Sequence, residues 1–529
     1  MRSWRAWLPW TAGGLLSAVA LAWLDPLGPP FGGLIGYLVL AAVCAALACL
    51  AWREVAERDA PRSLAVMLLV ALGLRLGTGI ALARLLPIYG YAEQVGQQAG
   101  YIFQDARLRD NDAWALGRSD QPLTRAFVRP QESDQYGGLL FLSAAVYRYL
   151  SAGVHRPLLV VLPAAVLGSL AVLFTWGFAA TVIGRRAGAV AGWVVALYPD
   201  AVLLGASQMR EPFIIVGLAL ALYGYAKARL GASRPGVVAL SLGILTALFV
   251  SPPYALVVLI LVALAWLWEG GLRPTWAAAG LAGLAALALG LTALAWSALQ
   301  DVGGGNPLAL LADWLMRGAQ FQLALLERGS GWVQRLFELT PEWMHLPLAT
   351  MYGLTRPLLP AALADRTGAV LWQIVEIWRS LGWFALLPIL VYAPAAGWRS
   401  GNRRGLALYL ALAFWAAAAI ASFRAGGDDW DNPRYRAVFV PLMGTLAGWA
   451  WFHARQAGSL WLRRAYIGVV GVTLIFLQWY AGRYYGTPRL SLEATLAAML
   501  GFSALYFGGM ALLDRRRAGP GLTGGVPEV

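Results

Sequence analysis

The chain has 529 residues, of which 59% are hydrophobic and only 13% carry a charged side chain. Because soluble domains average about 25% charged residues, this composition excludes an ordinary soluble enzyme and predicts an integral membrane protein. The formal net charge is +14. We expect most of the basic excess to anchor cytoplasmic loops, with the remainder available to anionic ligands or lipids.

Apolar runs of about 15 to 26 residues recur along the chain and indicate membrane-spanning helices. They fall near 8–24, 32–52, 64–86, 158–183, 188–206, 212–229, 236–250, 254–268, 275–299, 374–396, 405–423, 437–455, 464–482 and 490–513. The two runs split by Ser251-Pro252-Pro253 could instead form one broken or re-entrant pair. The sequence therefore predicts an all-α polytopic membrane protein with roughly 12–14 spans.

The first apolar run follows Arg2 and Arg5 and contains Ala20-Leu21-Ala22, which could pass for a signal-peptidase site. Because the chain behind it is polytopic, we expect a first helix that is retained. The two cysteines, Cys44 and Cys49, point in different directions on one helix, so we expect neither a disulfide nor a metal pair. The three histidines, His155, His345 and His453, are scattered, and we interpret them as interfacial residues.

Basic residues in short loops set the orientation of the spans. With the N-terminus inside, six basic loops fall in the cytoplasm: Arg53, Arg58 and Arg62; Arg185 and Arg186; Lys227, Arg229 and Arg234; Arg399, Arg403 and Arg404; Arg455, Arg463 and Arg464; Arg515, Arg516 and Arg517. This alternation requires that residues 138–150 do not cross. We expect this short segment, which carries Arg148, to lie on the outer surface as an interfacial helix.

The same alternation places four polar segments outside the cell: 87–157, 207–212, 300–373 and 424–436. We expect interfacial helices in these loops, including 300–373. The resulting organisation has N-terminal membrane helices over 1–63, a membrane core over 64–455, C-terminal helices over 456–513 and a cytoplasmic tail over 514–529. Arginines on the outer side are depleted by the positive-inside rule, so those present indicate function.

The most polar stretch is Gly100–Tyr136, which interleaves aspartates with arginines. The aspartates are Asp105, Asp110, Asp112, Asp120 and Asp134, and the arginines are Arg107, Arg109, Arg118, Arg125 and Arg129. Interleaved carboxylates and guanidinium groups could serve the transfer of a sugar. Moving a sugar from a lipid phosphate to a hydroxyl needs a carboxylate that takes the hydroxyl proton. It also needs a cation, from Arg, Lys or a metal, on the departing phosphate. The alternative is a solvated loop whose charges pair with each other, each pair worth about 0–1 kcal/mol.

Two further outward segments carry charge beside an apolar run. In Arg210-Glu211-Pro212 the proline suits the first helical turn, so Glu211 is placed at a helix N-terminus, and a plain helix cap is the alternative. In the segment 426–436, Arg434 and Arg436 flank Tyr435 and could bind a phosphate or pyrophosphate. The alternative for Tyr435 is an aromatic anchor at the membrane surface.

Three short motifs resemble the bacterial family 39 glycosyltransferases of the GT-C class, relatives of protein O-mannosyltransferases and aminoarabinose transferases. The first is FQDARLRDNDAWALG after an early helix, residues 103–117. The second is Leu197-Tyr198-Pro199 followed by Ser207-Gln208-Met209-Arg210-Glu211. The third is Pro433-Arg434-Tyr435-Arg436 with Pro441. The resemblance covers roughly residues 64–455, and the chain departs from the pattern in two additional N-terminal spans and three neighbouring aspartates.

The resemblance implies a GT-C-like bundle in the bacterial plasma membrane. The implied activity moves a sugar from a polyprenyl-phosphate donor to a lipid, glycan or protein acceptor at the extracytoplasmic face, with inversion at the anomeric carbon. It implies Asp105 or Asp110 as base, with Glu211 assisting. Arg434 and Arg436 would hold the donor phosphate, and Arg107, Arg109, Arg210 and Tyr435 complete the expected substrate-binding set. A divalent metal ion is the one cofactor allowed for, and the expected partners are the lipid-linked donor and membrane lipids, with no nucleic acid.

Two other functions fit the same pattern of spans. An O-antigen ligase or polymerase is also multi-span, with outward arginines and one large loop. A transporter or lipid flippase should place charges at the bilayer midplane or on broken helices. The predicted spans are nearly free of charge, with Arg75 and Glu376 among the few exceptions, which favours the enzyme.

Overall fold

The computed structural model describes residues 8–25, 29, 31–56, 61–128, 134–231, 233–269, 283, 307–327, 331–365, 368–400 and 405–518. The regular structure of these residues is helical throughout, and no strand occurs in them. Eight of their helices are long and apolar enough to cross a membrane. The expectation of an all-α polytopic membrane protein is therefore confirmed.

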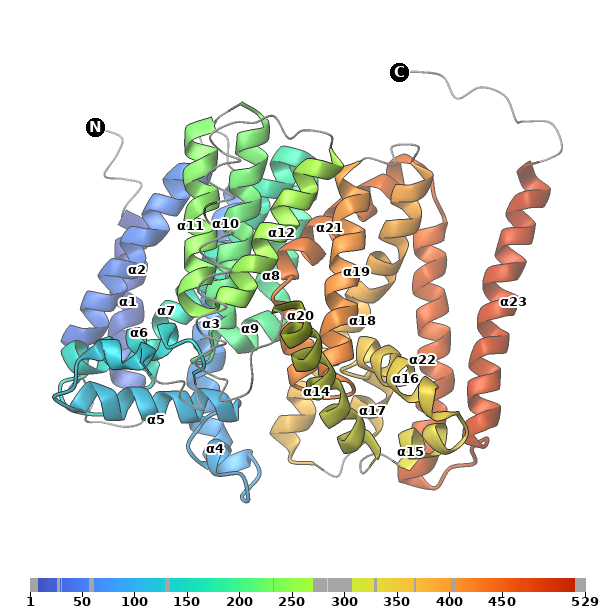
Figure 1. Ribbon diagram of the computed structural model, residues 1–529, viewed down its shortest axis with the longest axis horizontal. Helices are drawn as coiled ribbons and strands as arrows, with labels where there is room; N and C mark the ends of the chain where they lie inside the picture. The colour runs from blue at the N-terminus through green and yellow to red at the C-terminus, as the bar shows by residue number, and fades with distance from the viewer. Residues whose placement is uncertain are drawn as a thin grey trace.

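The helices of the bundle are drawn in Figure 1. The eight long ones are α2 (Leu34–Val55), α3 (Arg62–Tyr89), α7 (Leu158–Val182), α10 (Glu211–Arg229), α18 (Val370–Arg399), α19 (Leu406–Ala425), α22 (Trp461–Tyr485) and α23 (Leu492–Ala518). Four shorter apolar helices are also described: α1 (Leu8–Leu24), α6 (Gly138–Leu150), α11 (Ser233–Val250) and α12 (Pro252–Trp268).

Two expected spans are bent helix pairs. The chain turns by 56° between α8 (Arg185–Leu197) and α9 (Pro199–Gly205), and by 66° between α20 (Asp431–Ala437) and α21 (Val440–Gln456). Prolines in the first turns of α9 and α21 lack the N–H that would continue the preceding helix. If each pair is one span the described part has ten, fewer than the fourteen runs of the sequence. The run near 275–299 lies outside the described residues.

The centre of the bundle is built on α7 and α10. Their apolar windows are 89% and 83% buried inside the protein, whereas that of α23 is not buried at all. Helix α10 packs closely on α11, because a Cβ on Gly224 would lie 2.3 Å from the backbone N of Leu240. Since lipid supplies no hydrophobic drive between helices, such close approach through small residues is what holds them together.

Seven of the described helices, none of them among the membrane-crossing candidates, gather at one end of the bundle, which we call the polar end (Figure 1). They are α4 (Val95–Gln98), α5 (Gln104–Arg118), α6 (Gly138–Leu150), α14 (Pro307–Glu327), α15 (Gly331–Glu338), α16 (Glu342–Thr355) and α17 (Leu359–Ala364). Helix α6 packs against α5 and is too short to span a membrane, as expected. In the segment 300–373, which was predicted to form interfacial helices, most of the described residues lie in α14–α17 and at the start of α18.

Candidate functional site

A buried arginine at the polar end joins three carboxylates from distant parts of the chain. The side chain of Arg434, in α20, is only 7% exposed. Its Nη1 lies 3.0 Å from Asp105 Oδ2, its Nε lies 3.3 Å from Glu211 Oε1, and its Nη2 lies 3.2 Å from Asp431 Oδ1. We call these four residues the Arg434 cluster.

Each carboxylate of the Arg434 cluster sits in the first turn of a helix, where the helix dipole favours negative charge. Pro212 follows Glu211 and starts α10, as its position in the sequence predicted. Glu211 is buried, and its Oε2 has no hydrogen-bond partner among the described residues. Asp105 and Asp431 are open, with side chains 52% and 39% exposed. The cluster therefore has one buried and two accessible carboxylates.

The ionisation of Asp105 is set by two opposing effects. Partial burial raises the pKa of its carboxyl group, but Arg434 and, more weakly, Arg109 and Arg210 outweigh this, so that the pKa lies below its ordinary value. Asp105 is therefore a carboxylate at neutral pH, in the form that can accept a proton.

Other cations and phenols surround the Arg434 cluster. The guanidinium of Arg210 lies 5.3 Å from the ring centroid of Tyr136. Those of Arg434 and Arg424 lie 5.2 Å and 5.9 Å from the ring of Tyr435. The site thus combines carboxylates with arginine and tyrosine side chains, a set that can bind a phosphate and a sugar hydroxyl.

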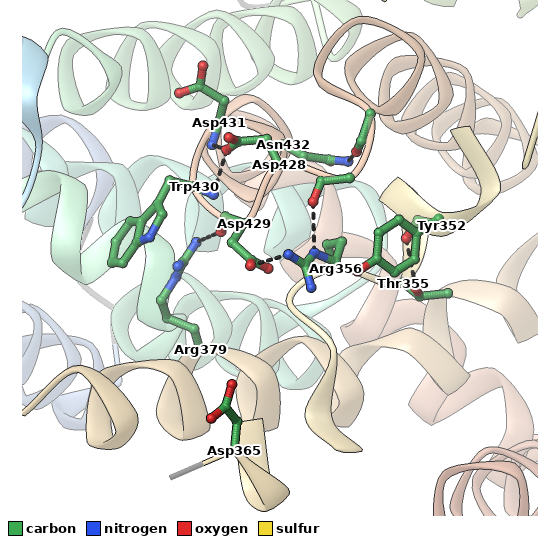
Figure 2. A network of polar contacts seen from close by, with 12 residues as sticks. Tyr352, Thr355, Arg356, Asp365, Arg379, Asp428, Asp429, Trp430, Asp431 and Asn432 are labelled. Atoms are coloured by element: carbon green, nitrogen blue, oxygen red, sulfur yellow. Dashed lines mark hydrogen bonds and ion pairs between the residues drawn. The ribbon is translucent and has the colours of Figure 1, made fainter. Parts of the chain in front are cut away.

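The loop that leads into α20 is held by two further arginines (Figure 2). Arg356 donates from Nε to the carbonyl oxygen of Gly427 at 2.9 Å and forms an ion pair with the carboxylate of Asp429. Arg379 donates from Nη2 to the carbonyl oxygen of Asp429 at 2.7 Å, and its guanidinium lies 3.9 Å from the ring centroid of Trp430. Asp431 points away from both arginines, toward Arg434.

Hydrogen bonds between its own residues also hold this loop in place. Asp428 Oδ1 accepts the backbone N–H of Trp430 at 2.7 Å and also that of Asp431. Asn432 Nδ2 donates to the carbonyl oxygen of Gly426 at 2.6 Å. The ring of Trp430 meets Phe103 edge to face at 5.6 Å, which ties the start of α5 to the loop. These contacts fix the position of α20, and hence of Arg434, relative to α5.

Arg379 is itself anchored deeper in the bundle. Its Nε lies 2.6 Å from Asp200 Oδ1 in α9, and the side chains of this pair are only 1% and 4% exposed. The two bent helix pairs therefore meet here, since α9 supplies Asp200 and also packs against α20. Sequence reasoning gave no role to Asp200 or Arg379, because no local pattern relates them.

Arg436 lies outside the Arg434 cluster. It is fully buried, its Nη2 donates to the carbonyl oxygen of Arg356 at 2.6 Å, and its guanidinium lies 3.5 Å from the ring centroid of Trp383. Arg436 thus contacts the backbone of Arg356, and Arg356 in turn holds the loop that leads into α20. Its expected role on the donor phosphate finds no support in this geometry.

Asp110 also lies apart from the cluster, on another face of α5. It is fully buried and accepts hydrogen bonds from the hydroxyl groups of Tyr101 and Tyr147, and its Oδ2 lies 2.6 Å from His155 Nε2. The ring of Trp114 stacks on His155 at 5.1 Å. His155 is therefore a packed partner of Asp110, where the sequence suggested a plain interfacial residue.

The remaining predicted residues are divided between these two places. Arg109 is buried beside the cluster, donates from Nη1 to the carbonyl oxygen of Gln208 at 3.1 Å, and lies 3.8 Å from Asp134. Arg107 lies near Tyr101, on the side of Asp110. Asp431 was missed by the sequence reasoning, although its spacing of three residues from Arg434 is that of helical neighbours.

The carboxylates do not form a ready metal site. In the part of the chain that the structure describes, no three acidic, histidine or cysteine side chains are placed to hold one ion. Around Arg434 the reason is visible, because the guanidinium lies between the three carboxylates. The three carboxylates are therefore arranged around a guanidinium group, and this arrangement does not fit a divalent cation.

A separate cavity of about 820 Å³ lies away from the Arg434 cluster. Its lining includes Arg186 near the start of α8, Arg229 at the end of α10, and Trp449 and His453 in α21. Glu211 begins α10, so this cavity is at the opposite end of that helix. It is not part of the candidate site.

No protein-family model and no curated protein sequence matches this chain. Among solved structures it is similar to the archaeal oligosaccharyltransferase AglB from Archaeoglobus fulgidus in complex with an inhibitory peptide and a dolichol-phosphate, at 15% identity and a TM-score of 0.40. It is also similar to the apo form of an oligosaccharyltransferase from the same organism, at 14% identity and a TM-score of 0.36. Each alignment covers 84% of this chain and 55% of the other, so the chain spans about half the length of these proteins. Likeness of this degree establishes neither a shared family nor a shared activity.

Proposed function

We propose that the protein is a membrane glycosyltransferase that moves a sugar from a polyprenyl-phosphate donor to an acceptor hydroxyl. The observation that carries this proposal is the Arg434 cluster. It gathers carboxylates from α5, α10 and α20 at one end of a membrane bundle. Acid–base chemistry beside a phosphate needs carboxylates and cations at one place, and this cluster supplies both.

In this mechanism Asp105 is the general base. It is the most exposed carboxylate of the cluster, and its lowered pKa keeps it ionised. As the acceptor oxygen bonds to the anomeric carbon, its proton passes to Asp105. The bond between the anomeric carbon and the phosphate oxygen breaks, and polyprenyl phosphate leaves with the electron pair. Attack from the side opposite the phosphate inverts the configuration.

Arg210 is the residue that we assign to the donor phosphate. Arg434 already faces three carboxylates and Arg436 faces backbone carbonyl groups, so neither is well placed for an additional anion. Arg210 lies beside the cluster and stacks on Tyr136. A guanidinium held in this way matches phosphate oxygens with two parallel N–H groups. Tyr435, packed against Arg434, is a second donor of hydrogen bonds to the substrate.

The polar end is proposed to face the extracytoplasmic side of a bacterial plasma membrane. At the other end of the bundle, basic residues begin α8 (Arg185) and end α10 (Lys227 and Arg229), α18 (Arg399) and α21 (Arg455). Such residues accumulate on the cytoplasmic side of membrane proteins. The Arg434 cluster would then meet donor sugars that have already been carried across the membrane.

A second candidate is a transporter or lipid flippase, which one observation favours. The two bent pairs, α8–α9 and α20–α21, meet at buried charges, and broken helices with buried charges are typical of transporters. The acidic groups of the Arg434 cluster lie at helix ends, however, where they suit a surface reaction better than passage through the bilayer.

The experiment that separates the two candidates uses purified protein in liposomes. Labelled sugar on a polyprenyl phosphate is supplied with an extract of membrane acceptors, and both labelled product and donor movement between leaflets are measured. We expect product without leaflet exchange, and a loss of roughly 10²–10⁴-fold in Asp105→Asn. Asp120→Asn, which removes an exposed aspartate of the same loop, is the matched control. Leaflet exchange without product would establish the transporter.

A further inference from the structure

Removal of Arg434 would leave an unusual set of charges. Asp105, Glu211 and Asp431 would face one another with no guanidinium between them, and Glu211 is almost completely buried. A buried carboxylate that loses its partner is strongly destabilised unless another cation replaces it. Glu211 Oε2 adds a further oxygen, buried and without a hydrogen-bond partner among the described residues.

We propose that Arg434 is the resident cation of this site and does the work for which a divalent metal ion was expected. Its replacement by an uncharged residue should convert the three carboxylates into a divalent-cation site. This inference rests on the proposed glycosyltransferase function for its catalytic part, whereas its cation-binding part stands on the geometry alone.

The geometry explains why the guanidinium and an ion exclude each other. Each of the three nitrogens of Arg434 lies 3.0–3.3 Å from a different carboxylate, so the arginine spaces these groups around its planar fork. Divalent ions need oxygens at about 2.0–2.6 Å, and Mn²⁺ accepts carboxylate ligands readily. With the guanidinium gone, the half-exposed Asp105 and Asp431 can close toward the fixed Glu211.

The positive charges of neighbouring arginines also disfavour a metal ion in the unchanged protein. Arg109 lies beside the cluster, and Arg210 precedes Glu211 in the chain; the positive charges of both lower the pKa of Asp105. With Arg434 present, three guanidinium groups oppose a second cation. In Arg434→Ala the cluster loses one positive charge and keeps all three carboxylates, which favours a doubly charged ion.

Binding is tested with Mn²⁺ alone, by electron paramagnetic resonance and titration calorimetry on the purified full chain. We expect Arg434→Ala to bind Mn²⁺ at least tenfold more tightly than the unchanged protein, and Glu211→Gln added to Arg434→Ala to abolish this gain. Arg434→Met, which keeps the bulk of the side chain, serves if the alanine variant unfolds. Arg156→Ala is the matched control, because it removes another buried arginine, one that faces the single carboxylate of Asp25 and takes no part in the Arg434 cluster.

Catalysis gives an independent readout. Transfer by the unchanged protein is expected to survive EDTA without loss. Tight Mn²⁺ binding by the unchanged protein that Glu211→Gln abolishes would overturn the proposal, as would transfer that EDTA stops and Mn²⁺ restores. Folded Arg434→Ala and Arg434→Met that both fail to bind Mn²⁺ would also overturn it. Absence of sugar transfer altogether would instead refute the glycosyltransferase and leave the Mn²⁺ result standing.

Discussion

Substitutions in the ion pair between Arg379 and Asp200 can separate two effects: the loss of folding stability and the displacement of Arg434. Both side chains are almost completely buried and lie 2.6 Å apart, so Arg379→Met leaves Asp200 charged and unpaired in the interior. Breaking such a pair from one side costs about 3–5 kcal/mol of folding stability. The variant also loses the charged hydrogen bond to the carbonyl oxygen of Asp429, worth about 1.5–3 kcal/mol, and the contact with Trp430, worth about 0.5–2 kcal/mol.

Arg379→Met combined with Asp200→Leu removes both charges. Since apolar side chains of similar volume often replace a buried ion pair without loss, this double variant should regain most of the stability. It should not regain transfer, because the loop before α20 stays released and Arg434 shifts. A displacement of about 1 Å can cost 10²-fold in rate, so we expect transfer to fall roughly 10- to 100-fold.

The assay pairs thermal unfolding in detergent with the rate of sugar transfer at saturating donor. Arg156→Met is the matched control, because Arg156 forms an equally buried pair with Asp25 and takes no part in the loop before α20. It should lose stability without any specific loss of rate in the fraction that is folded. Full recovery of transfer in the Arg379 and Asp200 double variant would refute the positioning role.

Three further predictions follow from single contacts. Arg434→Gln removes the strongest influence that lowers the pKa of Asp105, so the acid limb of residual transfer should move to higher pH, and an unchanged limb would contradict the assignment of Asp105 as base. Arg210→Lys keeps the charge but loses the planar fork, so the donor KM should rise about tenfold with little change in kcat, as initial rates against donor concentration will show. Gly224→Val places a methyl-bearing Cβ against the backbone of Leu240, so the unfolding temperature should fall by several degrees, whereas a neutral result would refute the close packing of α10 on α11.

The fold class could be predicted because membrane helices are specified by local composition. Long apolar runs have few other outcomes in lipid, and the start of α10 at Glu211-Pro212 followed from the proline alone. The number of spans could not be predicted equally well. Pro199 and Pro441 end one helical direction and begin another inside apolar runs that look continuous in the sequence.

The candidate site was only half predictable, for a reason of helix geometry. Asp105 and Asp110 are five residues apart on α5, which rotates them by about 140° around the helix axis, so one faces Arg434 and the other faces α6. Arg434 and Arg436 differ by about 200° on α20 and likewise point in opposite directions. Treating both segments as loops in the sequence hid these separations.

Contacts between distant segments were beyond the sequence. The pairing of His155 with Asp110, and that of Arg379 with Asp200, depend on how helices far apart in the chain pack together. Neither pair has a sequence spacing or a motif that would predict it. The GT-C likeness of the bundle stays a prediction.

The most direct test compares Asp105→Asn with Asp110→Asn in single-turnover transfer from a labelled polyprenyl-phosphate sugar. We expect Asp105→Asn to lower the rate of transfer roughly 10²–10⁴-fold in a protein that remains folded. Asp110→Asn should mainly lower the unfolding temperature, because Tyr101, Tyr147 and His155 lose their shared partner. Undiminished transfer in Asp105→Asn, or a purely catalytic loss in Asp110→Asn, would contradict the role of Asp105 as the general base.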